Sequence, residues 1–205
     1  MNLTKLSVSS IEILKTSGEF ETNTYKFKLD DIIHVIDPGF GIGEFLGEEE
    51  RVDVIITHGH YDHISGLPEI EFEKVYVSPE DSIALTDPTS NLSVFFTEPF
   101  AFEVEWYNID EYFQTVLAPG HTPGSRIVIF DGVIFTGDVV FSNSIGRVDL
   151  YVDKSEQAAM RKQMTATIKR LRDLFKSFPE EWYICPGHGE LVTIKRLFEL
   201  NPFFK

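Results

Sequence analysis

The sequence predicts an α/β protein, because short apolar strands that end in glycine or proline turns alternate with helical segments. Residues 32–36 are followed by Asp37-Pro38-Gly39, residues 52–56 by a histidine-rich turn, and residues 182–185 by Pro186-Gly187. Residues 155–178 have the periodicity of a long amphipathic helix. At 205 residues the chain is long enough for one large core, so we expect a single domain over residues 1–205.

The strand predicted over residues 52–56 ends in an unusually dense group of polar side chains. Thr57-His58-Gly59-His60-Tyr61-Asp62-His63 contains four potential metal ligands within six residues. His58 and His60, two apart in an extended segment, project to the same side and can bind one ion together. After the turn that Gly59 permits, Asp62 and His63 are aimed at a neighbouring position. This segment can therefore supply ligands to two adjacent ions.

Three strand ends in the second half of the chain each present one further candidate ligand. Residues 116–118 lead to Pro119-Gly120-His121, and residues 182–185 lead to His188. Residues 127–135 form a predicted hairpin around Asp131-Gly132 and lead to Asp138. Each of these residues alone is an ordinary loop or turn residue, but together with the dense histidine motif they indicate a metal site.

The helix predicted over residues 155–178 places apolar residues at steps of three and four positions along the chain. Ser155 is the predicted N-cap, and Pro179 is predicted to stop the helix. The eighteen phenylalanines predict an aromatic core. We expect this core to include Phe95, Phe96, Phe100, Phe102, Phe203 and Phe204, with a substrate pocket or subunit contact as the alternative. His34 and Cys185, inside apolar strands, are also predicted to be structural.

The motifs at the predicted strand ends resemble those of the metallo-β-lactamase superfamily, and within it the glyoxalase II-like branch. They are Thr57 to His63, Pro119 to Ser125, Phe135-Thr136-Gly137-Asp138 and Pro186-Gly187-His188-Gly189. Segments 146–150 and 201–203 are similar to that branch as well, so the resemblance covers nearly the whole chain. It implies a four-layer αββα sandwich. It also implies a hydroxyacylglutathione hydrolase-like enzyme, which here is expected to lack the C-terminal helical domain.

The resemblance implies a centre with two metal ions that share one bridging carboxylate. His58, His60 and His121 would hold the first ion; Asp62, His63 and His188 would hold the second; Asp138 would bridge both. Imidazole and carboxylate ligands suit divalent transition metals, zinc first, with iron or manganese as alternatives. Two ions about 3.5–4 Å apart can activate a shared water, which Asp62 would also face as a catalytic residue.

The implied activity is hydrolysis of a thioester or related ester. Two alternatives stay open, namely a mononuclear iron persulfide dioxygenase that would use His58, His121 and Asp138, and a metal-holding protein without fast chemistry. The bridging role of Asp138 argues against hydrolysis of β-lactam antibiotics, since the better-known β-lactamases of the superfamily have no such bridge. Carboxylates at Asp149 and Glu190, where the branch has tyrosines, argue against tight binding of glutathione.

Two further residues have predicted roles near the metals. Arg147 would bind an anionic group of the substrate, or else pair with Asp149 or Asp153. Asp37 would accept a hydrogen bond from a ligand histidine, or else be an ordinary turn residue.

The composition of the chain, including its charge, indicates which partners and which compartment to expect. With 18 basic against 33 acidic residues and a net charge of −15, nucleic acid is not expected as a partner, and a small-molecule substrate is. No apolar run is long enough to span a membrane, so no membrane partner is expected. Residues 1–6 lack the apolar stretch of a signal peptide, and the single cysteine fits a reducing compartment, so we expect a cytoplasmic protein. The oligomeric state is not predicted.

Overall fold

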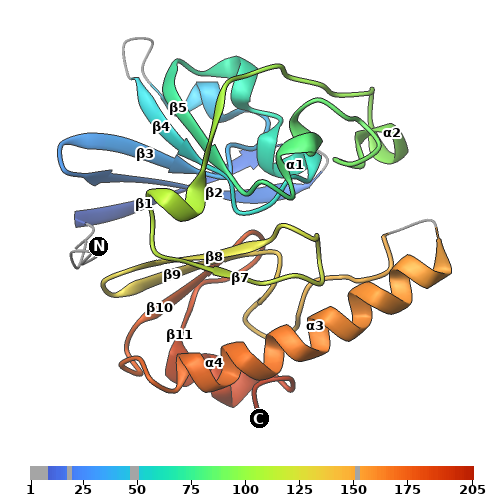
Figure 1. Ribbon diagram of the computed structural model, residues 1–205. Helices are drawn as coiled ribbons and strands as arrows, with labels where there is room; N and C mark the ends of the chain where they lie inside the picture. Colours follow the sequence, from blue (N-terminus) through green and yellow to red (C-terminus); the bar gives the residue numbers. More distant parts are fainter. Residues whose placement is uncertain (1–8, 18–19, 47–50, 151–152) are drawn as a thin grey trace.

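The computed structural model describes residues 9–17, 20–46, 51–150 and 153–205, so the N-terminal segment 1–6 lies outside the described residues. Two β-sheets pack face to face, and helical segments cover the outer face of each (Figure 1). The predicted α/β class and the αββα sandwich are confirmed.

The first sheet contains six strands in the order β1-β2-β3-β4-β5-β6. Their bounds are β1 Ser9–Ser17, β2 Glu21–Leu29, β3 Ile32–Ile36, β4 Val52–Ile55, β5 Phe72–Val77 and β6 Trp106–Asn108. Strands β3 to β6 pair in parallel. Their carboxyl ends therefore lie at one edge of the sheet, which places Asp37, the histidine motif and the segment after β5 side by side.

The second sheet contains five strands in the order β11-β10-β9-β8-β7. Their bounds are β7 Thr115–Leu117, β8 Arg126–Phe130, β9 Val133–Gly137, β10 Tyr183–Pro186 and β11 Val192–Thr193. The predicted hairpin between β8 and β9 is confirmed, and Gly132 takes the positive φ of 89° that its turn requires. Because β9 and β10 are parallel, Asp138 and His188 emerge at the same edge.

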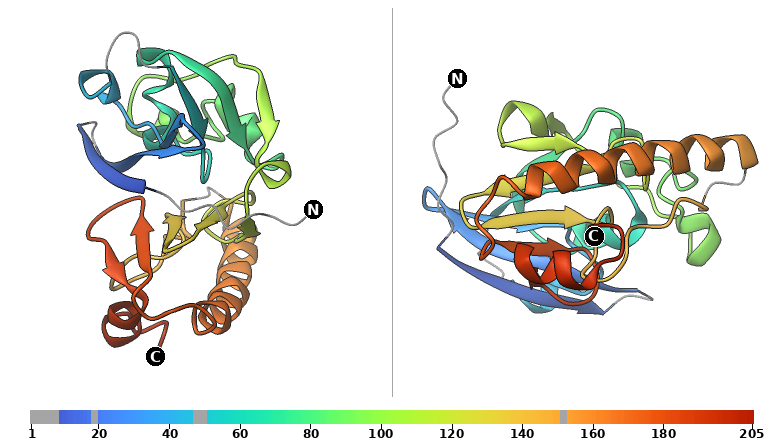
Figure 2. Two further views of the ribbon diagram at one scale, coloured as in Figure 1. Left: turned by 90° about the vertical axis from the view of Figure 1, so that its left-hand side faces the viewer. Right: turned by 90° about the horizontal axis from the view of Figure 1, so that it is seen from below.

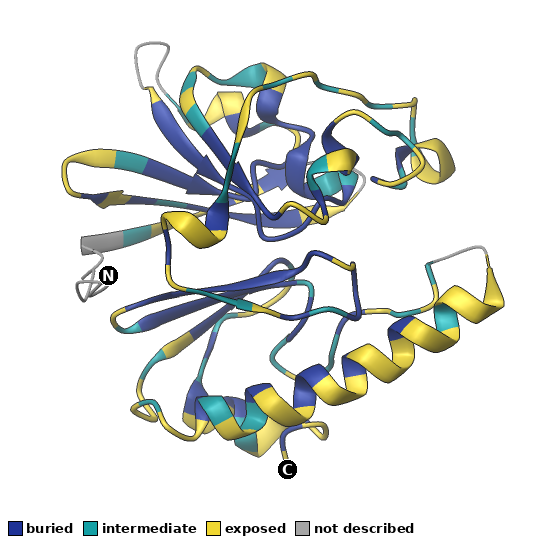
Figure 3. Cartoon of the chain, in the orientation of Figure 1, coloured by how far each residue is buried: buried dark blue, intermediate teal, exposed yellow. Residues whose placement is uncertain are grey.

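An aromatic core fills the space between the two sheets. Phe27 of the first sheet stacks on Phe135 of the second, with ring centroids 5.7 Å apart. The ring of His34 also stacks on that of Phe27, with centroids 5.5 Å apart, and Cys185 is buried in the same cluster as Phe27. Both predicted structural roles are therefore confirmed. Figure 3 shows the central strands of the two sheets as the most buried, with β4, β8 and β9 buried over their whole length. This packing brings the two edges that carry polar side chains together.

Helices α3 Lys154–Phe175 and α4 Ile194–Leu200 cover the outer face of the second sheet (Figure 2). The predicted N-cap is wrong: the carboxylate of Asp153, not Ser155, caps α3 by accepting hydrogen bonds from the backbone N–H groups of Ser155 (2.7 Å) and Glu156 (3.2 Å). The helix also ends earlier than predicted, at Phe175, because the backbone N–H of Phe178 bonds to the carbonyl of Phe175 and so closes a tight turn.

The outer face of the first sheet is covered by short helical segments. They are α1 Tyr61–Ile64 and α2 Ser93–Phe96 with the 3-10 turns Ile42–Glu44, Leu67–Glu69 and Ser82–Leu85, while a fourth 3-10 turn, Ile109–Glu111, follows β6. None of the helices in the described part of the chain is long and apolar enough to cross a membrane.

Three of the phenylalanines predicted for the core are exposed instead. Phe95, Phe96 and Phe203 have relative exposures of 51%, 43% and 48%, whereas Phe204 is buried. Helix α2 is a single turn at the periphery, so its aromatic side chains have no layer of chain above them.

Candidate metal centre

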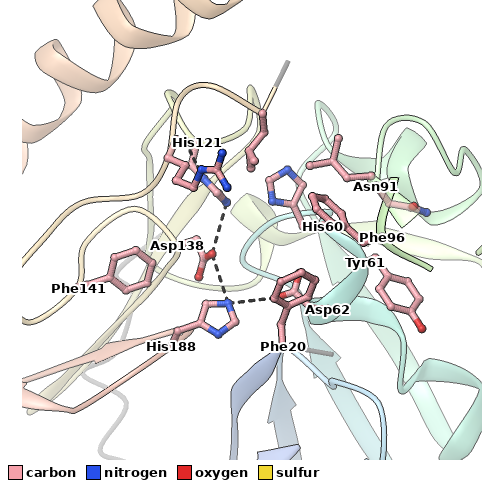
Figure 4. Close-up of a pocket in the computed structure, with 13 residues that line it drawn as sticks. Phe20, His60, Tyr61, Asp62, Asn91, Phe96, His121, Asp138, Phe141 and His188 are labelled. Carbon is pink, nitrogen blue, oxygen red and sulfur yellow. Dashed lines mark hydrogen bonds and ion pairs between the residues drawn. The ribbon is translucent and has the colours of Figure 1, made fainter. Parts of the chain in front are cut away.

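The seven predicted ligands meet where the polar edges of the two sheets face each other. Figure 4 shows five of them, His60, Asp62, His121, Asp138 and His188. Residues His58, His60, Asp62 and His63 follow β4 of the first sheet. His121, Asp138 and His188 come from loops of the second sheet, after β7, β9 and β10. Residues separated by more than a hundred positions in the chain thus surround one small volume.

His58, His60 and His121 form the first cluster, in which one ring nitrogen from each lies within 4.8 Å of the others. All three side chains are buried. Burial and the neighbouring imidazoles hold the pKa of His58 well below its usual range, and burial together with His121 lowers the pKa of His60 to about 3. These two rings are therefore neutral near pH 7, which is the form that binds a metal.

Asp62, His63 and His188 form the second cluster, again with ligand atoms within 4.8 Å of one another. Nε2 of His188 lies 3.0 Å from Oδ2 of Asp62. Although burial opposes the charge, Asp138 and Asp62 raise the pKa of His188 to about 10. Against the same opposition from burial, nearby carboxylates hold the pKa of His63 well above its usual range. The second cluster therefore strongly favours a positive charge.

Asp138 lies between the two clusters. Its Oδ2 is 3.5 Å from Nε2 of His121 and 3.4 Å from Nε2 of His188 (Figure 4). Its Oδ1 is 3.4 Å from Nε2 of His63. Burial would raise the pKa of Asp138, but His63 and His188 hold it well below its usual range. An ionised carboxylate thus contacts both groups of ligands.

The residues of the centre fit a pair of transition-metal ions. Nε2 of His58 and Oδ1 of Asp138 are buried, yet neither makes a hydrogen bond within the described part of the chain. Buried polar atoms are normally satisfied, and a cation would satisfy both. Gly187 leaves the necessary room, since a Cβ there would lie 2.3 Å from Oδ1 of Asp138 and 2.5 Å from Cε1 of His63. Five imidazoles and two carboxylates suit zinc, iron or manganese.

Contacts on the outer side of the rings orient three of the histidines. Nδ1 of His121 donates to the backbone carbonyl of Arg147 (2.9 Å), and Nδ1 of His188 donates to that of Glu21 (2.6 Å). Nδ1 of His63 lies 3.0 Å from Oδ2 of Asp37, the residue predicted to contact a ligand histidine. Asp37 is itself held by the backbone N–H and the hydroxyl of Thr57. Such contacts direct the opposite nitrogen, Nε2, into the centre.

Asp81 joins the loops of the first cluster and was missed by the sequence analysis. This buried carboxylate accepts hydrogen bonds from the backbone N–H groups of Gly59 (3.1 Å) and Gly124 (2.7 Å) and from the hydroxyl of Thr122 (2.6 Å). Gly59 separates His58 from His60, and Thr122 follows His121. The segment Pro79-Glu80-Asp81 resembles an ordinary surface turn, so its sequence carries no signal of this role.

A cavity of about 270 Å³ opens above the two clusters. Its lining includes ligands of both clusters, Arg147, and a set of apolar side chains: Phe20, Leu92, Phe96, Phe141 and Leu150. Arg147 also forms a two-pronged ion pair with Asp149, at 2.9 Å and 3.2 Å, which was one of its two predicted roles; the other, binding an anionic group of the substrate, stays a prediction. The ring of Tyr61 packs edge-on against Phe100, and its hydroxyl points away from the ligands (Figure 4).

Residues 35–188 match the sequence model of the metallo-beta-lactamase superfamily. A protein of Streptococcus pyogenes named "probable metallo-hydrolase" is 31% identical, over 89% of this chain and 85% of its own. The hydroxyacylglutathione hydrolase GloC of Haemophilus influenzae is 27% identical, over 82% of this chain and 85% of its own.

Two solved structures have the same fold and nearly the same extent. BLEG-1, described as a B3 metallo-beta-lactamase, aligns with a TM-score of 0.77 and 26% identity, covering 96% of this chain and all (100%) of the other. TTHA1623, solved in a di-iron-bound form, aligns with a TM-score of 0.72 and 25% identity, covering 92% and 98%.

Proposed function

Since the chain belongs to the metallo-beta-lactamase superfamily, we propose that it is a dinuclear metal-dependent hydrolase of a thioester or related ester. The observation that carries this proposal is the position of Asp138, whose carboxylate contacts His63, His121 and His188 and so joins two separate groups of ligands. A centre for one ion would not need a carboxylate placed between two groups.

In the proposed centre each of the seven residues has a metal to hold. His58, His60 and His121 would hold one ion, Asp62, His63 and His188 would hold the other, and Asp138 would be shared by both. Zinc is the first candidate, and iron or manganese are the alternatives. Two ions in such a site supply a water of lowered pKa and polarise a carbonyl oxygen.

The protein side chains orient the reactants. In the overall reaction the oxygen of water bonds to the acyl carbon, the carbon–sulfur bond breaks, and the thiol leaves with a proton. Asp62, which lines the cavity, accepts a hydrogen bond from the entering water and orients it. Arg147, on the same cavity, receives an anionic part of the leaving group. The net charge of −15 supports a small-molecule substrate rather than nucleic acid.

The similarity to GloC supports a thioester substrate, since that relative is named a hydroxyacylglutathione hydrolase. The similarity to BLEG-1 raises hydrolysis of β-lactams as a second possibility, which the proposed bridging role of Asp138 disfavours. The mononuclear dioxygenase would use only His58, His121 and Asp138. It would leave the second cluster, in which three ligand atoms lie within 4.8 Å, without a role.

Metal content and activity of the same preparation test the proposal. Protein purified without added metal should contain close to two transition-metal ions per chain by elemental analysis, and should hydrolyse thioesters without consuming oxygen. The variant His34→Gln, altered in the core away from the ligands, serves as a control that should keep both ions. One iron per chain together with oxygen consumption would instead identify a dioxygenase, and two ions without turnover would identify a metal-holding protein.

A further inference from the structure

We infer that the substrate carries an apolar acyl group, held against a surface formed by Phe20, Leu92 and Phe96 beside the metal centre. This inference rests on the proposed hydrolase function and names its substrate class. All three side chains line the cavity that contains His60, Asp62, His121, Asp138 and His188. A scissile carbonyl placed at these ligands therefore has this apolar surface within reach of its substituents.

Phe20 and Phe96 meet across the cavity rim although they are far apart in the chain. Their rings pack edge to face with centroids 5.4 Å apart, and their exposures are 42% and 43%. Phe20 precedes β2, and Phe96 ends α2 (Figure 4). Large aromatic surface left half exposed beside a reactive centre is stabilised when an apolar group covers it.

Leu92 is held in a strained conformation that directs it to the same cavity. Its φ of 68° is in the left-handed region, where the other three non-glycine residues of the described chain are all aspartates. Aspartate tolerates this region far better than leucine. Strain of this kind persists only where the surroundings enforce it, and it is typical of ligand-binding sites.

The side chain and backbone of Asn91 enforce the conformation of Leu92. Its Nδ2 donates to the carbonyls of Ala84 (2.8 Å) and Phe100 (2.9 Å), and its Oδ1 accepts from the backbone N–H of Ser93 (3.0 Å). Its backbone carbonyl accepts from the N–H of Tyr61, which is adjacent to His60. The backbone at Leu92 is thus tied to the segment that carries His60.

The distribution of charge in the cavity indicates where the acyl group and the leaving group of the substrate bind. Apart from histidines, Arg147 is the one cationic side chain among the described residues that line the cavity. An anionic leaving group can pair with Arg147, whereas a hydroxylated or charged acyl group would lose its water at Phe20, Leu92 and Phe96 without gaining a partner. The acyl group is therefore apolar.

Thioesters of one thiol with acetyl, butanoyl, hexanoyl and lactoyl groups test this inference on the metal-loaded protein. The value of kcat/KM should rise by about fourfold for each added methylene until the cavity is filled, because each one leaves water. Lactoyl should be a poorer substrate than butanoyl. Phe96→Ala, and independently Phe20→Ala, should flatten this dependence. Phe95→Ala is the matched control, because Phe95 lies on the same helix with 51% exposure but does not line the cavity.

Binding of the free carboxylates gives a second readout that does not need turnover. By calorimetry, affinity for butanoate, hexanoate and octanoate should increase with length for the wild type and Phe95→Ala, but not for Phe96→Ala. Hydrolysis with equal kcat/KM for all acyl groups, or a preference for lactoyl, overturns the apolar acyl assignment and leaves the hydrolase proposal intact. No hydrolysis of any thioester or ester by protein that holds two ions overturns the proposed function itself, and the acyl assignment with it.

Discussion

Replacing Asp81 by alanine should weaken both the fold and the first cluster of ligands. Asp81 is the acceptor for the backbone N–H groups of Gly59 and Gly124, which belong to different loops. Its removal leaves two buried donors without an acceptor, while Thr122 keeps a contact with the hydroxyl of Ser125 at 2.6 Å. The loops that carry His58, His60 and His121 then lose their common anchor.

The size of the effect follows from these contacts. A buried N–H group left without an acceptor costs about 1–3 kcal/mol, so two such groups correspond to about 2–6 kcal/mol of unfolding free energy. Burial raises the pKa of Asp81, which shows that its charge is itself costly to bury, so we expect the lower half of this range. Asp81→Asn keeps one acceptor oxygen and should lose about half as much. Affinity for the first ion should fall by ~10- to 100-fold, as for other residues that orient ligands.

Urea unfolding of metal-free protein measures the stability, and metal titration followed by calorimetry measures the affinity. The expected order of destabilisation is Asp81→Ala, then Asp81→Asn, with no change for Asp173→Asn, a substitution on the exposed face of α3. The reasoning is refuted if Asp81→Ala unfolds within about 0.5 kcal/mol of the wild type, the range of ordinary surface substitutions, or if both metal sites weaken equally.

Three further outcomes are expected. Asp62→Asn should reduce kcat by ~100-fold or more with an unchanged circular dichroism spectrum, and a retained rate would contradict its placement beside the water. Arg147→Gln should raise KM ~10-fold for thioesters with anionic leaving groups. Asp149→Asn, which releases Arg147 from its ion pair, should lower KM for the same substrates. Equal changes in KM for neutral substrates would contradict the role of Arg147 in binding the anionic group. Hydrogen bonds from Arg126 hold the pKa of Asp110 in the folded protein below its usual value of 3.8. The stability that Asp110 contributes is therefore fully present above pH 3.8 and is lost as the pH falls through the lower pKa of the folded state. Asp110→Asn should therefore cost about 1 kcal/mol at pH 7 and far less at pH 2, whereas an equal loss at both pH values would argue against the linkage.

Local patterns in the sequence were sufficient to predict the α/β class, most strands, the β8–β9 hairpin and the long helix α3. Alternating and continuous apolar runs are properties of short segments, and Asp131-Gly132 encodes its turn within two residues. The candidate ligands could also be found locally, since each follows a strand end in a short motif of histidine, aspartate and glycine. Their roles at the metals stay a prediction until metal content is measured.

The tertiary structure alone decided which residues surround these ligands. Asp81 contacts Gly124 across 43 positions of the chain, and nothing in either segment indicates the other. Phe96 was predicted for the core, because its hydrophobicity does not reveal whether another layer of the fold covers it; the structure leaves it half exposed against Phe20. The motifs that provide the candidate ligands are visible in the sequence itself. The contacts that orient those ligands and shape the cavity form only when the two sheets pack together. The spacing of residues along the chain is enough to identify the ligand motifs, whereas the orienting contacts depend on the free energy of packing segments that are distant in sequence.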